Sequence, residues 1–193
     1  MDRHEQAQAA KREERRTRAR LKKISHQRFS EVQYESEMQK FEKHLEKHGL
    51  KVHEVDSDGN CLFGAISDQL YGSEDKKDEL RQQTCKYMQE NKEEYRLFLE
   101  DDMDFDRYCV NMRRDGIWGG QMELTIMAQL HRFNVIVHQV ENPSMAQGFF
   151  PWGEVPCLHI SFHLECHYNS VRREDDPCDG KPATDYAIGH DLS

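Results

Sequence analysis

The chain has 193 residues, of which 36% are hydrophobic and 33% are charged, and its formal net charge is −9. This length fits one ordinary domain with extensions, and the low hydrophobic share predicts that part of the chain is solvated. No apolar run reaches the length of a membrane span, no signal peptide is recognisable, and the six cysteines lack a regular framework spacing. We therefore exclude a membrane protein and a disulfide scaffold, and we expect a reduced, monomeric protein of the cytoplasm with access to the nucleus.

Positive charge is concentrated at the beginning of the chain. Residues 1–30 contain ten Lys or Arg and four Asp or Glu, a net of +6, which leaves −15 for residues 31–193. Residues 1–28 lack Gly and Pro and show almost no apolar face, which predicts a solvated helix or a disordered arm. A basic arm can contact RNA or ribosomes, although the interleaved Glu residues and the lack of aromatic side chains weaken that interpretation.

Apolar residues at three- and four-residue spacing predict the helices. The first helix starts at Ser30, which forms a capping-box pattern with Gln33, and ends at Gly49. An extended segment over 50–55 leads from it into a polar turn at 58–60. Further helices are expected from Cys61 to Leu70, near 78–91, around 95–99, from the acidic run 100–106 to Met112, and over 122–130.

Strands are predicted in the last third of the chain. Residues 134–140 form one strand, and residues 158–164 alternate strictly between apolar and polar side chains, as in a half-buried strand whose His159 and His163 face solvent. After a short break the extended pattern resumes over 167–172. The intervening segment 141–156 is rich in Pro and is predicted to be a loop without a strand ladder. This organisation divides the chain into an arm at 1–28, a domain at 29–175 and a tail at 176–193.

Cys61 is the candidate nucleophile, because it stands at the start of a buried helix directly after Asp58, Gly59 and Asn60. Unpaired N–H groups and the positive end of the helix dipole stabilise a thiolate there, so we expect this thiol to ionise more readily than an ordinary cysteine. The N–H groups of the turn can also face an oxyanion. An inert buried cysteine is the alternative, and the polar turn before it weakens that interpretation.

His167 is the candidate base for this thiol. In a strand, His167 and Asn169 project to the same side, so the amide oxygen of Asn169 can accept a hydrogen bond from one ring nitrogen. The other ring nitrogen is then able to take the thiol proton. A histidine with a purely structural role is the alternative.

Three blocks of sequence resemble the OTU (ovarian tumour domain) family of cysteine deubiquitinases, most closely its OTUD3 type. They are Asp58-Gly59-Asn60-Cys61-Leu62-Phe63, His167-Tyr168-Asn169-Ser170-Val171, and Ile117-Trp118-Gly119-Gly120 with the helix 122–130 and the strand 134–138 after it. The blocks occur in the order and at spacings typical of the family, over roughly residues 45–175. Gly64 departs from the family pattern, where a larger residue is common, at a helix-propensity cost of about 1 kcal/mol relative to Ala.

The resemblance implies an α/β (α+β) fold of the OTU papain-like cysteine protease type, with a small central β-sheet flanked by helices. It implies hydrolysis of isopeptide bonds in ubiquitin chains and ubiquitinated proteins, without a metal or an organic cofactor. By resemblance Cys61 is the nucleophile, His167 the base, Asn169 the residue that orients it, and Asp58 the organiser of the oxyanion turn. The family resemblance also places substrate contacts at Trp118, Gly119, Gly120 and Tyr168.

Three other interpretations compete with this one. A metal site is suggested by the residues Cys157, His159, His163, Cys166 and His167, although this set lacks the paired ligands of a typical zinc site. A thiol hydrolase of a ubiquitin-like protein would share the chemistry. A non-catalytic ubiquitin- or RNA-binding module is the third, and the presence of both Cys61 and His167 weighs against it.

Overall fold

The structure is a computed structural model that describes residues 31–99, 103–139, 145–163 and 166–183. The predicted arm at 1–28 and the end of the predicted tail lie outside these residues. The chain divides into two compact units, residues 1–40 and 41–193, and the site lies in the second. Helix α2 (Glu31–Glu46) begins in the first unit and ends in the second.

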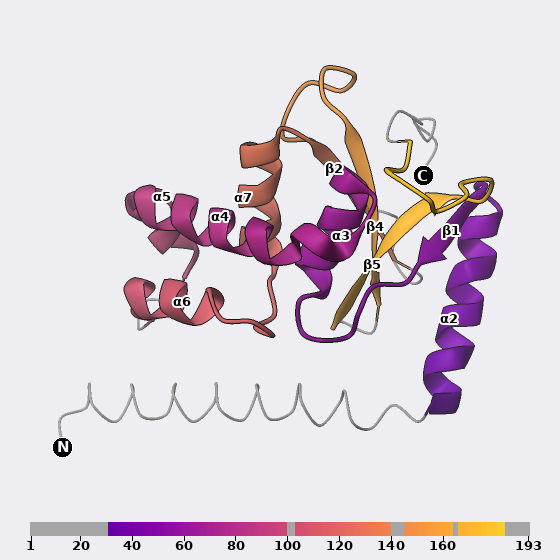
Figure 1. Cartoon of the computed structure of the whole chain (residues 1–193), viewed down its shortest axis with the longest axis horizontal. Coiled ribbons are helices and arrows are strands. Elements are labelled where there is room, and N and C mark those ends of the chain that lie inside the picture. Colours follow the sequence, from indigo (N-terminus) through magenta and orange to yellow (C-terminus); the bar gives the residue numbers. More distant parts are fainter. Residues whose placement is uncertain (1–30, 100–102, 140–144, 164–165, 184–193) are drawn as a thin grey trace. The chain divides into compact units, whose positions relative to one another are not determined.

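A five-stranded mixed sheet forms the centre of the second unit (Figure 1). Its strands are β1 (Leu50–His53), β2 (Asn134–His138), β3 (Met145–Gln147), β4 (Cys157–His163) and β5 (His167–Arg173). The order across the sheet is β1-β5-β4-β2-β3, and only the pairing of β2 with β4 is parallel. The small central sheet predicted from the sequence is confirmed.

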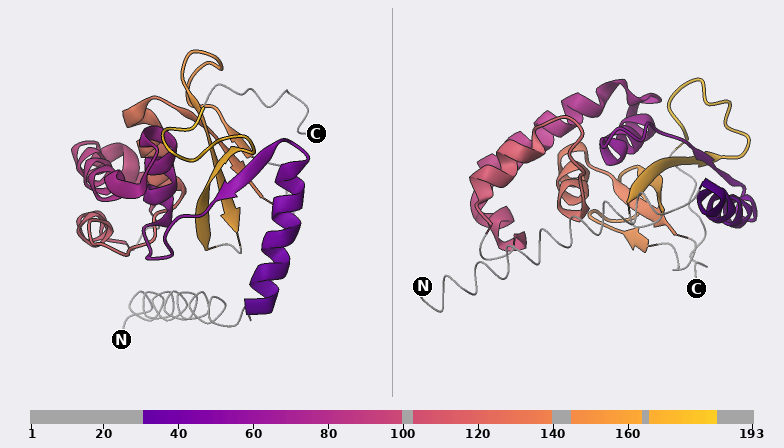
Figure 2. Two further views of the ribbon diagram at one scale, coloured as in Figure 1. Left: turned by 45° about the vertical axis from the view of Figure 1, so that its right-hand side comes forward. Right: turned by 90° about the horizontal axis from the view of Figure 1, so that it is seen from below.

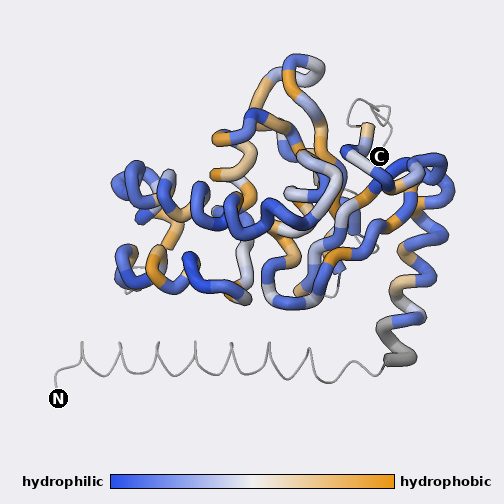
Figure 3. Tube along the Cα trace, viewed as in Figure 1, coloured by the Kyte–Doolittle hydropathy of each residue, from blue (hydrophilic) through white to orange (hydrophobic). Residues whose placement is uncertain are grey.

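The helices that follow β1 lie on the apolar side of this sheet. They are α3 (Cys61–Tyr71), η1 (Glu74–Lys76), α4 (Lys77–Glu90), α5 (Lys92–Tyr95), η2 (Arg96–Phe98), α6 (Phe105–Met112) and α7 (Gln121–His131). The main core joins side chains of α3, α4 and α7 to Leu158 and Ile160 of β4. Both views of Figure 2 place α4, α5 and α6 together beyond one side of the sheet. In Figure 3, β4 and α7 carry hydrophobic stretches, whereas α4 is mostly hydrophilic.

The polar face of β4 is buried as well, which the sequence did not predict. His159 is 0% exposed and His163 is 6% exposed. Phe41 and Leu45, in the last turns of α2, pack beside the sheet with Leu50 and Val171, and the Phe41 ring meets the edge of His163. The expectation of solvent-exposed histidines is wrong because strand alternation shows which residues share a face and does not show what covers that face.

The segment 141–156 also differs from its prediction. Residues 145–147 form β3, which pairs antiparallel with β2, so the expectation of a loop without a ladder is wrong for these three residues. The prolines of the segment flank β3 and leave its N–H groups available for the ladder. Phe149 packs against the main core, whereas Trp152 is half-exposed.

The chain remains attached to the sheet after β5. Arg172 is fully buried and forms an ion pair with Asp68 of α3. The same guanidinium donates to Asp176 at 3.1 Å and to the carbonyl oxygen of Gly180 at 3.0 Å. Within the described ranges, no helix combines the length and the apolar character required to span a membrane.

Candidate active site

Cys61 is the first residue of α3, as the sequence predicted. The turn before it is tight: Gly59 has a φ of +88°, and a Cβ at this position would collide with the backbone oxygen of Gly116. The carboxylate of Asp58 accepts a hydrogen bond from the backbone N–H of Asn60 at 2.8 Å. A positive φ and a close backbone approach together require glycine at position 59.

The side chain of Asn60 fastens this turn to the loop before α7. Its amide nitrogen donates to Asp115 at 2.7 Å, and its oxygen accepts from the backbone N–H of Gly116 at 3.1 Å and from the guanidinium of Arg81. Arg81 is 1% exposed, donates to the carbonyl oxygen of Met112 at 2.9 Å, and lies over the ring of Phe63. The two loops at the start of α3 are therefore held by one hydrogen-bond network around the buried side chains of Asn60 and Arg81.

Asp58 is ionised in this turn. Although partial burial opposes ionisation, hydrogen bonds from Lys77 and from Asn60 hold the pKa of Asp58 at about 2. The Nζ atom of Lys77 lies 2.8 Å from the Asp58 carboxylate. Asp58 thus shapes the turn by accepting from Asn60 and places a negative charge close to Cys61.

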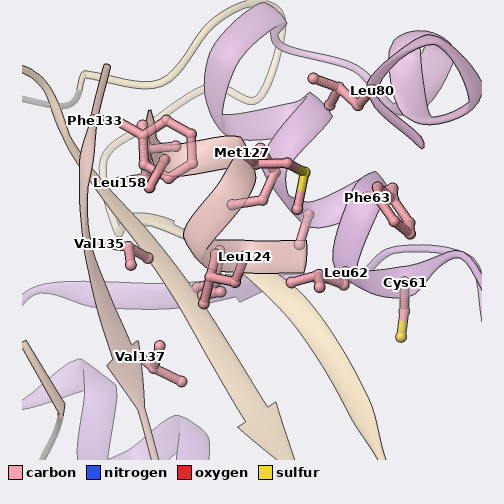
Figure 4. Packing of buried hydrophobic residues seen from close by; sticks show 14 of the residues in the cluster. Cys61, Leu62, Phe63, Leu80, Leu124, Met127, Phe133, Val135, Val137 and Leu158 are labelled. Atoms are coloured by element: carbon pink, nitrogen blue, oxygen red, sulfur yellow. The ribbon is translucent and has the colours of Figure 1, made fainter. Parts of the chain in front are cut away.

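The expectation that the Cys61 thiol ionises readily is wrong for the free protein. Burial raises the pKa of the Cys61 thiol, the charge of Asp58 raises it further, and hydrogen bonding to the backbone of Tyr168 and Leu62 opposes these effects. The Cys61 residue is 6% exposed, and Figure 4 shows its sulfur pointing away from the side chains packed around Leu62 and Phe63. A thiol in this environment requires a base to remove its proton.

His167 and Asn169 lie on β5 as predicted, and their side chains are joined. The Nε2 atom of His167 is 3.0 Å from the Oδ1 atom of Asn169, which also accepts from the backbone N–H of Val55 at 2.9 Å. Because Oδ1 can only accept, Nε2 carries the proton and Nδ1 is the ring nitrogen that can receive the thiol proton. The backbone of Tyr168, between these two residues, lies close enough to the Cys61 thiol to lower its pKa, so β5 borders the start of α3.

The loop expected to contact substrate lies over the same helix. A Cβ on Gly119 would come within 2.9 Å of the Leu62 side chain, so this loop runs directly across the first turn of α3. The backbone N–H of Gly120 donates to the buried carboxylate of Glu123 at 2.8 Å. Trp118 is 38% exposed beside them. The Tyr168 ring packs against the Phe162 ring at a tilt of 33°, with ring centroids 4.6 Å apart.

The histidines of the rival metal site serve other contacts. His159 pairs with His138 of β2 at 3.0 Å, and His163 contacts Ser161 and Asn169. Over the described ranges, no group of three or more His, Cys, Asp and Glu side chains is arranged to hold an ion. A cysteine at the start of a helix, bordered by a His–Asn pair on a neighbouring strand, is the arrangement of a thiol protease.

Comparisons with known proteins place this arrangement in a family. The model of the OTU-like cysteine proteases matches residues 56–170. Ovarian tumor domain-containing deubiquitinating enzyme 7 of Arabidopsis thaliana is 37% identical over 88% of this chain and 44% of that protein. OTU domain-containing protein 3 of Mus musculus is 35% identical over 81% of this chain and 40% of that protein. The solved OTU domain of OTUD1 aligns with a TM-score of 0.64 and 28% identity, over 72% of this chain and 95% of that domain.

The chain belongs to the family of OTU-like cysteine proteases. It spans less than half of the length of the two curated relatives above. The resemblance to the OTU family, its OTUD3 type included, and the expected α/β fold are confirmed.

Several residues of the site were missed by sequence reasoning. The burial of Arg81 could have been predicted from the sequence, because position 81 falls on the same helical stripe as Thr84, Cys85 and Met88. Asn60 was placed in the turn, but its side-chain contacts to the 115–116 loop depend on residues far along the chain. His163 carried no usable signal, since its partners come from two strands and a helix.

Proposed function

We propose that this chain is a deubiquitinase that hydrolyses isopeptide bonds at the C-terminal glycine of ubiquitin. The observation that carries the proposal is the position of Cys61 at the start of α3, bordered by the β5 segment that joins His167 to Asn169. The relative from Arabidopsis thaliana is named a deubiquitinating enzyme. One solved OTU domain, with a TM-score of 0.52 and 22% identity, is in complex with ubiquitin.

The reaction is acyl transfer through a thioester. The Nδ1 atom of His167 removes the proton of the Cys61 thiol, and the sulfur attacks the carbonyl carbon of the terminal glycine. His167 then gives that proton to the leaving lysine amine as the carbon–nitrogen bond breaks. Water, deprotonated by His167, attacks the thioester and releases the glycine carboxylate and the Cys61 thiol. Asn169 keeps the ring oriented throughout and fixes the tautomer of its neutral form.

Two loops complete the site in this proposal. Backbone N–H groups between Asp58 and Cys61 stabilise the oxyanion of the tetrahedral intermediate, and the network of Asn60 keeps them in place. Gly119, between Trp118 and Gly120, borders the first turn of α3, where a glycine-rich C-terminal tail would enter. The net charge of −15 in residues 31–193 would draw in a basic partner surface, and ubiquitin is basic around its tail.

The purified chain should cleave ubiquitin that carries a fluorogenic C-terminal amide, and Cys61→Ser should abolish the cleavage. A ubiquitin probe with a C-terminal electrophile should form one covalent adduct that is lost in the same variant. If the chain cleaves only the corresponding substrates made from ubiquitin-like proteins, the assignment of ubiquitin as the substrate is wrong. Binding without any adduct or turnover would leave a non-catalytic module. A panel of diubiquitins then gives the linkage preference.

The remaining parts of the proposal concern the setting of the enzyme. We propose a monomer of the cytoplasm and nucleus, where the reducing environment keeps Cys61 as a thiol. We assign hydrolysis to a domain over 29–175, a separable basic arm to 1–28 and a tail to 176–193. RNA association of the arm is tested by comparing the full chain with a chain that lacks residues 1–28 in a binding assay at two salt concentrations.

A further inference from the structure

The sheet face that carries His167 and Asn169 holds a second histidine that the proposed reaction does not use. His163 of β4 lies opposite His167 of β5, and Ser161 lies opposite Asn169. Residues paired across antiparallel strands project to the same side, so these four side chains form one cluster. The Phe41 ring closes it, edge-on to His163 with centroids 4.7 Å apart.

The amide of Asn169 has only one orientation that satisfies its neighbours. The backbone N–H of Val55 lies 2.9 Å from Oδ1, and a backbone N–H can only donate. Oδ1 is therefore the acceptor that also faces Nε2 of His167, and Nδ2 is the donor that faces His163. A half-turn of the amide would set a donor against the Val55 N–H and would leave Nε2 of His167 facing a donor, which favours the other tautomer of that ring.

The contact on the other side of the Asn169 amide defines the protonation state of His163. Its Nε2 atom lies 3.2 Å from Nδ2 of Asn169 and 2.8 Å from the hydroxyl oxygen of Ser161. Because Nδ2 can only donate, Nε2 of His163 accepts and carries no proton, and the ring proton resides on Nδ1. A second proton on this ring would face the Asn169 amide nitrogen and favour the wrong amide orientation.

We propose that His163 is a positioning residue: its unprotonated Nε2 holds the Asn169 amide in the orientation that fixes the tautomer of His167. This inference rests on the proposed function, because it assigns to His163 a part in preparing that base. His163 contacts Asn169, and Asn169 contacts His167, so we expect His163 to act on the rate of the reaction rather than on substrate binding.

The surroundings of His163 keep it neutral. Burial, with a smaller contribution from the charge of His167, lowers the pKa of His163 to about 4. His167 is the titratable group that faces it from β5, Ser161 and Asn169 supply neutral polar contacts, and α2 supplies the Phe41 ring. The orienting contact is thus intact at neutral pH.

A double-mutant cycle separates orientation from general support of the fold. In the wild-type background, His163→Leu should lower kcat roughly tenfold, the equivalent of one lost hydrogen bond, with KM unchanged. In the Asn169→Asp background the same substitution should change kcat less than about twofold, because a carboxylate presents an acceptor oxygen in either orientation. His163→Gln, whose amide oxygen can occupy the place of Nε2, should recover most of the loss.

His159→Leu is the matched control, since His159 is a buried histidine of the same strand that pairs with His138. Its effect should be the same in the wild-type background and in the Asn169→Asp background. Equal losses from His163→Leu in the two backgrounds, or no recovery with His163→Gln, would show that His163 only supports packing. These kinetics use the fluorogenic ubiquitin amide. If the wild-type chain does not cleave it, the proposal that ubiquitin is the substrate is wrong, whereas the tautomer assignment is unaffected.

The tautomer is tested without any variant. Long-range proton–nitrogen NMR spectra of the wild-type chain at neutral pH should show His163 protonated on Nδ1 and bare on Nε2, with His167 protonated on Nε2. This result would support the inference even if ubiquitin proved to be the wrong substrate. A proton on Nε2 of His163 at neutral pH would overturn it.

Discussion

Substitution of Gly59 by alanine tests whether the turn before Cys61 is built as the structure shows. The φ of +88° belongs to the left-handed region, which costs a residue with a Cβ about 1–2 kcal/mol. The added Cβ would also meet the backbone of Gly116, which cannot move away as a flexible side chain can.

The loop that carries Gly116 would have to retreat. Its movement would stretch the hydrogen bonds of the Asn60 side chain to Asp115, at 2.7 Å, and to the N–H of Gly116, at 3.1 Å. Each is worth about 1 kcal/mol net, so Gly59→Ala should lower the free energy of unfolding by about 3–4 kcal/mol in total. Displaced N–H groups in the oxyanion turn should lower kcat by about 10²–10³-fold in molecules that remain folded.

Gly64→Ala is the matched control on the same helix. A Cβ there would come within 2.7 Å of the Glu74 carboxylate, which is the end of a flexible side chain. The loss of the 3.0 Å bond from the Asp56 N–H to Glu74 is offset by a helix-propensity gain of about 1 kcal/mol, so the net change should lie near zero.

Urea unfolding and turnover of the fluorogenic ubiquitin amide measure both variants. A Gly59→Ala chain as stable as Gly64→Ala, with turnover within threefold of wild type, would refute the description of the turn.

Four further predictions concern the base, its orientation, the arm and the charge beside the thiol. His167→Ala should lower kcat by about 10²–10⁴-fold in the ubiquitin amide assay, and near wild-type turnover would move the base elsewhere. Asn169→Asp should keep much of the activity and shift the acidic limb of the pH–rate profile upward, because a carboxylate raises the pKa of His167; an unshifted limb would contradict this. Deletion of residues 1–28 should leave turnover within a few-fold, and a collapse of turnover in a folded chain would make the arm part of the catalytic unit. The hydrogen bonds that lower the pKa of Asp58 to about 2 stabilise the fold above pH ~4, and this contribution is lost as the pH falls toward 2. Lys77→Met should therefore weaken the dependence of stability on pH in acid unfolding measurements. An unchanged acid transition in this variant would contradict the prediction.

The raised pKa of the Cys61 thiol has a consequence for how the site works. A thiol that is neutral in the protein without substrate needs its base to remove the proton at the moment of attack. The rate of attack therefore depends on the orientation of His167. Val55, Asn169 and His163 together determine that orientation through hydrogen bonds that meet on one amide group. Changes to these contacts should therefore alter kcat before they alter binding.

The sequence by itself determined the local part of this protein. Helical spacing after the turn 58–60 located Cys61 at the first residue of α3, and strand alternation placed His167 and Asn169 on one side of β5. These relations depend on the periods of helix and strand, which the order of residues expresses directly. The three blocks of family resemblance then joined segments that lie far apart in the chain.

Only the tertiary structure decided which groups surround these residues. The burial that raises the pKa of Cys61, the closure of the polar face of β4 by Phe41, and the network between Asn60, Arg81 and Gly116 all join distant segments. Periodicity specifies the direction of a side chain along its own element, whereas burial and hydrogen-bond partners depend on which other element packs against it.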